Sequence, residues 1–126
     1  MLTKGFKQCL AEANAAIETA SVEEARRLHA AGDVLFVDVR EGTEHVQGHI
    51  PGSVSAPRGF LEFIADPESP MHKPALSSGR RLILYCASGG RSALAAKTLR
   101  DMGIAQVCHM AGGFGGWVQS GGPAER

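Results

Sequence analysis

A cysteine, four small residues and an arginine lie together in the stretch Cys86-Ala87-Ser88-Gly89-Gly90-Arg91-Ser92, which follows an apolar run. Small side chains allow successive backbone N–H groups to turn toward one point. The N-terminus of a following helix adds a partial positive charge at the same place. The pattern therefore predicts an anion-binding loop centred on the sulfur of Cys86.

Arg91 opens the helix predicted after this loop. A cation at a helix N-terminus opposes the helix dipole, so its position is favourable mainly if an anion lies between the two. That anion could be the Cys86 thiolate, a persulfide or a bound oxyanion. The same surroundings should lower the pKa of the Cys86 thiol and make it nucleophilic near neutral pH. An inert buried cysteine is the alternative, but it leaves Gly89 and Gly90 unexplained.

Short apolar strands that alternate with helices must position this loop. Strands are predicted at 34–37, 82–85 and 106–110, with a weaker one at 53–55, and a helix is predicted at 91–102. This alternation is typical of an open α/β sheet, in which ligands bind beyond the carboxyl ends of the strands. Cys86 and Asp38 each follow such an end.

Two helices are predicted before the first strand. Phe6, Leu10, Ala13 and Ile17 recur at helical spacing, which indicates an amphipathic helix packed on the body of the domain. The run Ser21-Val22-Glu23-Glu24 matches a capping box, and Gly32 is placed to end the second helix.

The segment 60–76 differs from the rest. Its first residues could form a short amphipathic helix, which Pro67, Pro70 and Pro74 then interrupt. The segment could border the site, although most such stretches are surface loops. Trp117 and the phenylalanines are interpreted as core residues.

Composition limits the function classes. The 126 residues suit one domain, and the 13 basic and 13 acidic side chains give no net field for nucleic acid or an anionic membrane. Three cysteines without CxxC spacing indicate neither a disulfide framework nor a zinc site, which favours a reducing cytoplasm. Polar residues interrupt the N-terminal segment where a signal peptide would be apolar, and no run reaches the ~18 apolar residues that span a bilayer.

Several motifs in this sequence follow a known family order. Asp38-Val39-Arg40 follows a buried strand, Gly48-His49-Ile50-Pro51-Gly52-Ser53 lies downstream, and Gly112-Gly113-Phe114 precedes Trp117. With the cysteine loop, they resemble the rhodanese family of sulfurtransferases over about residues 21 to 117. Each motif is short, but the ordered set is specific.

The resemblance implies an α/β fold, a rhodanese-like three-layer domain with a central parallel β-sheet flanked by helices. We expect this domain at residues 21–120, with an N-terminal helical extension at 1–20 packed on it and a C-terminal tail at 121–126.

The resemblance also implies two-step transfer of sulfane sulfur. The Cys86 thiolate would attack a small-molecule donor, thiosulfate or a persulfide, and a thiophilic acceptor such as cyanide would remove the sulfur. A protein acceptor is also compatible. Backbone N–H groups from Ala87 to Ser92 would hold the persulfide, and Arg91 would bind the anionic donor. No metal, organic cofactor, nucleic acid or membrane is expected.

Three further residues are assigned supporting roles by the resemblance. Asp38 and Arg40 match a pair that supports the site, either as an ion pair at the surface or by direct contact with substrate. Arg58 is expected to add positive charge at the mouth of the site.

Other functions remain open at this point. Rhodanese-like domains also serve as persulfide carriers or as sensor and regulatory modules. Related phosphatases and arsenate reductases share the fold, but their loop has one residue more than the four that separate Cys86 from Arg91. Cys9 and Cys108 are interpreted as packing residues, with a resolving role toward Cys86 left open.

Two patterns are interpreted as structural. Glu44, His45 and His49 are discounted as metal ligands, because Gly48 and Pro51 break the helix that would align them. The glycine-rich run 112–116 does not match G-x-G-x-x-G and is predicted to be a turn that closes near the cysteine loop.

Overall fold

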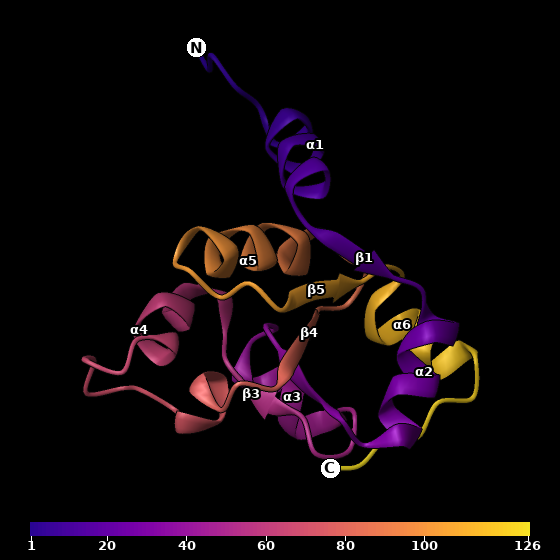
Figure 1. Cartoon of the computed structure of the whole chain (residues 1–126). Helices are drawn as coiled ribbons and strands as arrows, with labels where there is room; N and C mark the ends of the chain where they lie inside the picture. Colours follow the sequence, from indigo (N-terminus) through magenta and orange to yellow (C-terminus); the bar gives the residue numbers. More distant parts are fainter.

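A five-stranded parallel sheet runs through the middle of the molecule (Figure 1). The computed structural model describes all residues, Met1–Arg126. The strands lie in the order β1-β5-β4-β2-β3. They comprise β1 (Glu18–Ala20), β2 (Val34–Asp38), β3 (Val54–Ser55), β4 (Arg81–Tyr85) and β5 (Val107–Met110). The predicted α/β class and parallel sheet are confirmed.

Helices cover both faces of this sheet (Figure 1). They are α1 (Phe6–Ala16), α2 (Val22–Ala31), α3 (Gly42–Gln47), α4 (Leu61–Ala65), α5 (Gly90–Asp101) and α6 (Gly113–Gln119), with short 3-10 turns η1 (Arg58–Phe60) and η2 (Pro74–Ser77). Helices α4 and α5 pack on one face, and α2 and α6 pack on the other. None of the helices combines the length and the hydropathy needed to cross a membrane.

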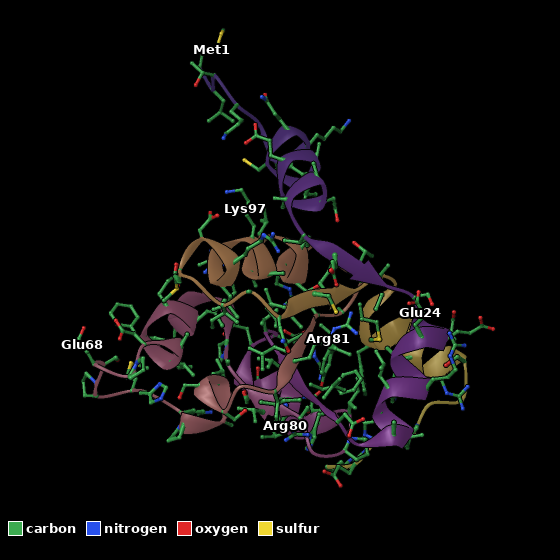
Figure 2. All side chains as sticks on the ribbon, viewed as in Figure 1. Met1, Glu24, Glu68, Arg80, Arg81 and Lys97 are labelled. Carbon is green, nitrogen blue, oxygen red and sulfur yellow. The ribbon has the colours of Figure 1, made fainter.

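The central strand β4 is buried on both sides, which explains its unbroken apolar sequence. Leu82 and Leu84 face the core under α4 and α5. Ile83 and Tyr85 face the second core, which contains Trp117 of α6. Side chains fill the space between the sheet and the flanking helices (Figure 2). The strand is therefore a rigid support for the loop that follows it.

The N-terminal region also follows its sequence signals. Ser21 Oγ accepts the N–H of Glu24 at 3.1 Å, and the Glu24 carboxylate accepts the N–H of Ser21 at 3.3 Å. This is the predicted capping box, and Gly32 ends α2 as expected. Helix α1 packs along α5 and buries Ala13 there, while the N-terminus points away from the sheet (Figure 1).

Two expectations need correction. Strand β1 was not predicted, because Glu18–Ala20 is short and polar and forms only by pairing with β5. The phenylalanines are not all core residues, since Phe6, Phe60 and Phe63 are 70%, 51% and 55% exposed. Helix α4 buries Leu61, Ile64 and Ala65, whereas its single aromatic residue, Phe63, faces solvent.

Candidate active site

Cys86 lies directly after β4, in the middle of the sheet. It is 1% exposed, and its neighbours Ala87 and Ser88 are exposed. The preceding residue, Tyr85, pairs in register with Asp38 at the end of β2, so the two strand ends lie side by side. The loop then enters α5 at Gly90. The sulfur therefore sits where parallel sheets bind their ligands.

The loop turns hydrogen-bond donors toward this sulfur. The backbone N–H groups of Gly89 and Ser92 lie 3.1 and 3.4 Å from Cys86 Sγ, and Ser92 Oγ lies 3.5 Å away. Gly89 has φ of 125°, a conformation that favours glycine. Burial alone would raise the pKa of the Cys86 thiol, but hydrogen bonds from Ser92, Gly89 and Ser88 outweigh it and hold that pKa below its ordinary value.

The glycine-rich first turn of α6 contacts the loop from the other side. The N–H of Phe114 donates to the Cys86 carbonyl at 2.8 Å, and the N–H of Gly115 donates to the Ala87 carbonyl at 3.1 Å. A Cβ on Gly113 would lie 2.5 Å from the Ala87 carbonyl. The close approach therefore needs glycine. The run 112–116 lies against the cysteine loop as expected, but Gly113 to Gly116 begin α6 instead of forming a separate turn.

The Arg91 side chain forms a bidentate ion pair with Glu44 of α3. The Nη1–Oε1 and Nη2–Oε2 distances are 2.8 and 3.3 Å. The pairing raises the pKa of Arg91 and lowers the pKa of Glu44. A cavity of about 340 Å³ beside the pair is lined by Arg40, Glu44, Gln47, Gly48 and Phe114. Sequence reasoning missed this partner, because the two residues lie 47 positions apart in the sequence.

Asp38 and Arg40 form a second bidentate pair at distances of 2.9 and 2.7 Å. Both residues are buried, so the expectation of an ion pair at the surface is wrong. Tyr85 donates its hydroxyl proton to Asp38, and Arg40 donates to the Gly48 carbonyl at 2.7 Å. The pair thus links the end of β2 to the turn at residues 48–53 and to Tyr85, the residue that precedes Cys86.

Two histidines lie beside this pair. His45 Nδ1 is 2.9 Å from the Asp38 carboxylate, and the ring of His45 stacks on the ring of His49 with centroids 3.8 Å apart. These residues do not form a group that could hold a metal ion. Their contacts bind α3 to the following turn.

Arg58 lies on a different part of the surface. It donates to Glu62 at 3.2 Å and to Thr98 at 3.1 Å, and it makes no hydrogen bond with the cysteine loop. It lines a separate cavity between α1 and α5, near the labelled Lys97 (Figure 2). The structure therefore does not bring Arg58 together with Cys86 and Arg91.

One polar residue behind the loop was not singled out from the sequence. His109 of β5 is buried, and its Nδ1 lies 3.0 Å from Ser92 Oγ. Its Nε2 lies 3.3 Å from Asn14 Oδ1 of α1. Burial lowers the pKa of His109. The available signal was a histidine inside an otherwise apolar strand, which requires a buried hydrogen-bond partner.

Comparisons with known proteins agree with this geometry. A sequence model of the Rhodanese-like domain matches residues 21–120. A thiosulfate:glutathione sulfurtransferase of Saccharomyces cerevisiae is 35% identical, over 84% of this chain and 81% of its own. A human single-domain sulfurtransferase is 30% identical, with a TM-score of 0.68, over 80% of this chain and 95% of its own.

A solved structure from Rhodopseudomonas palustris is 49% identical with a TM-score of 0.93, over 99% of this chain and 97% of its own. It is described as a protein of unknown function and a possible tyrosine phosphatase. The sulfurtransferase relatives support a general role in sulfur transfer. With its matched domain and its cysteine loop at the end of β4, this chain belongs to the rhodanese-like domain family.

Proposed function

We propose that this protein is a sulfurtransferase that moves sulfane sulfur from a donor such as thiosulfate to a thiophilic acceptor through a persulfide on Cys86. The observation that carries the proposal is the set of donors around one sulfur. Two backbone N–H groups and the Ser92 hydroxyl lie within 3.5 Å of Cys86 Sγ. Such donors stabilise a thiolate without a bound metal ion.

The first half-reaction loads the sulfur. The Cys86 thiolate attacks the outer sulfur of thiosulfate, a new S–S bond forms, and sulfite leaves with the electron pair of the broken S–S bond. The neighbouring loop residues Ala87 and Ser88 are exposed, so we expect a donor to reach the sulfur from that side. Backbone N–H groups of the loop then stabilise the anionic persulfide.

The second half-reaction unloads it. An acceptor nucleophile, cyanide or a thiol, attacks the outer sulfur, and the Cys86 thiolate leaves. The name of the yeast relative, thiosulfate:glutathione sulfurtransferase, makes a small thiol a reasonable acceptor for this chain. The donors that lower the pKa of Cys86 favour both steps, because the thiolate is the nucleophile of the first and the leaving group of the second.

A phosphatase is the second candidate, because the Rhodopseudomonas palustris relative is described as a possible one. The length of the loop favours sulfur transfer. Only four residues separate Cys86 from Arg91, so the loop suits a small ligand.

Steady-state turnover tests the proposal and separates an enzyme from a carrier. With thiosulfate and cyanide, the wild-type protein should form thiocyanate over many cycles, whereas a carrier would stop after one. Cys86→Ser should abolish turnover, and Cys9→Ser and Cys108→Ser serve as matched controls that retain it. Hydrolysis of p-nitrophenyl phosphate without thiocyanate formation would instead support the phosphatase.

A further inference from the structure

A continuous chain of hydrogen-bonding groups connects Cys86 with the N-terminal helix. Cys86 Sγ and Ser92 Oγ are 3.5 Å apart, and Ser92 Oγ and His109 Nδ1 are 3.0 Å apart. His109 Nε2 is 3.3 Å from Asn14 Oδ1. The members come from the end of β4, from α5, from β5 and from α1. Four separate elements thus meet behind the cysteine loop.

The Asn14 amide sets the direction of this chain. Asn14 Nδ2 donates to the Leu10 carbonyl at 3.0 Å, so Oδ1 is the atom that faces His109. An amide oxygen only accepts, and His109 Nε2 must therefore carry a hydrogen. In a neutral imidazole, Nδ1 is then an acceptor for the Ser92 hydroxyl proton at 3.0 Å, in competition with the Gly89 carbonyl at 3.2 Å from Ser92 Oγ. Ser92 Oγ in turn can accept a hydrogen bond from the Cys86 thiol at 3.5 Å.

The surroundings of His109 suit a neutral acceptor that is coupled to the thiol. Thr19 of β1 and Leu84 of β4 flank it in the sheet, and Gly89 of the cysteine loop lies against its ring. No carboxylate or cation hydrogen-bonds to it, and burial is the sole cause of its lowered pKa. In such a buried site of low dielectric constant, a thiolate and an imidazolium that both hydrogen-bond to the Ser92 hydroxyl stabilise each other strongly.

We propose that His109 is a positioning residue that takes up the Cys86 proton through Ser92, with Asn14 of α1 holding the resulting imidazolium. The proton of the Cys86 S–H bond moves to Ser92 Oγ as the Ser92 hydroxyl proton moves to His109 Nδ1. One S–H bond and one O–H bond break, one O–H bond and one N–H bond form, and the net charge is unchanged. The inference rests on Cys86 being the nucleophile of the proposed sulfur transfer.

This relay gives the N-terminal helix a role in the site. Asn14 lies outside residues 21–120, the part of the chain that matches the family. The Nε2–H of an imidazolium donates to Asn14 Oδ1, which stabilises the charged ring. Helix α1 therefore contributes to the reactivity of a cysteine that lies 72 residues further along the chain.

The protonation state of His109 tests the relay directly. In protein labelled with ¹⁵N-histidine, the His109 resonances can be assigned with His109→Gln. Burial alone favours the neutral ring, so the imidazolium that we expect at His109 in the wild type at neutral pH requires the Cys86 thiolate, and Cys86→Ser should show a neutral ring protonated at Nε2. A neutral ring in both proteins, or an imidazolium in both, would overturn the proposal, because the proton would not come from Cys86.

Thiol reactivity provides a second readout that requires no sulfur transfer. Alkylation of Cys86 by iodoacetamide is followed as a function of pH by the mass of its peptide. His109→Gln should move the midpoint upward by about one pH unit or more, a roughly tenfold loss of thiolate below the midpoint. Asn14→Ala should shift it less in the same direction, and Gln8→Ala, on the same helix, should not.

The outcomes separate the relay from the proposed function. If His109→Gln slows alkylation equally at every pH, His109 acts only in packing and the relay is wrong. If the imidazolium and the midpoint shift are observed but thiosulfate loads no sulfur, the relay stands and the proposed donor chemistry fails. The first test needs His109→Gln only to assign the resonances, and its result is read from the wild type and Cys86→Ser.

Discussion

The Arg91–Glu44 pair should control how well the cysteine loop accepts an anionic donor. Glu44→Gln removes the negative charge but retains the side-chain oxygen that accepts the Glu41 N–H at 3.0 Å and caps α3. With this change, Arg91 no longer has to leave a carboxylate in order to bind thiosulfate. We expect kcat/KM for thiosulfate to rise.

The size of the effect follows from the geometry. The two bonds of the pair are 2.8 and 3.3 Å long, but the side chains of Arg91 and Glu44 are 40% and 35% exposed. Solvent screening limits such a pair to ~0.2–1 kcal/mol, and bidentate geometry favours the upper end. Glu44→Gln should therefore raise kcat/KM about fivefold. Arg91→Ala loses a charge-assisted contact with the donor, ~1–3 kcal/mol, which lowers kcat/KM roughly 5- to 150-fold.

Steady-state assays with two donors measure this. Thiosulfate and an uncharged organic polysulfide are compared at a fixed cyanide concentration for the wild type, both single variants and the double variant. The uncharged donor should be nearly insensitive to either change. The double variant should behave like Arg91→Ala, because Glu44 acts only through the guanidinium.

Two results would refute this reasoning. One is an unchanged or lower kcat/KM for thiosulfate in Glu44→Gln. The other is an equal gain from Glu44→Gln in the presence and in the absence of Arg91, which would mean that the carboxylate acts on the donor by general repulsion.

Three predictions concern the scaffold. Asp38→Asn leaves Arg40 buried without its anion, which should lower the free energy of unfolding in urea by about 3–5 kcal/mol. Burial would raise the pKa of Asp38, but hydrogen bonds, chiefly from Arg40, hold it below its ordinary value. The stabilisation is therefore present above the unfolded-state pKa of about 4 and lost as pH falls through the folded-state pKa, so wild-type and variant stabilities should converge in acid. Burial raises the pKa of Tyr85, the single tyrosine, to about 12. Its phenolate absorbance should appear near pH 12 in the folded protein and near about 10 in urea, and the stability that it contributes below pH ~10 should be lost as pH rises toward 12. A midpoint near 10 in both states would contradict its burial. Gly113→Ala forces a Cβ into the backbone of the cysteine loop and should lower stability by about 1–3 kcal/mol and change the alkylation rate of Cys86. Gly42→Ala, in open space, is its control, and equal effects of the two would contradict the contact.

Much of the fold could be predicted from local patterns. The buried strands β2 and β4 contain continuous apolar runs, β5 is apolar except for His109, and Ser21 and Gly32 mark the ends of α2 by capping chemistry. Strand β1 could not be predicted in this way, because its three residues become a strand only by pairing with β5. The short helix after residue 60 was expected, but the exposure of Phe60 and Phe63 was not, because tertiary packing decides which side of a short helix is buried.

The contacts of the candidate site also fall into predictable and unpredictable groups. The donors around Cys86 come from its own loop, so sequence spacing predicts them. Sequence spacing does not predict the partners of Arg91 and Ser92, because Glu44 lies on α3 and His109 lies on β5. Likewise, Asn14 meets His109 across 95 residues of sequence. Spacing along a chain cannot reveal contacts that only the packing of separate elements creates.

The most direct test of the central claim is the intact mass of the reduced protein after incubation with thiosulfate. The wild type should gain the mass of one sulfur atom and lose it again when cyanide is added. Cys86→Ser should gain nothing, whereas Cys9→Ser and Cys108→Ser should load as the wild type does. If Cys86→Ser loads as fully as the wild type, or if the folded wild type takes up no sulfur, Cys86 does not carry sulfur from thiosulfate.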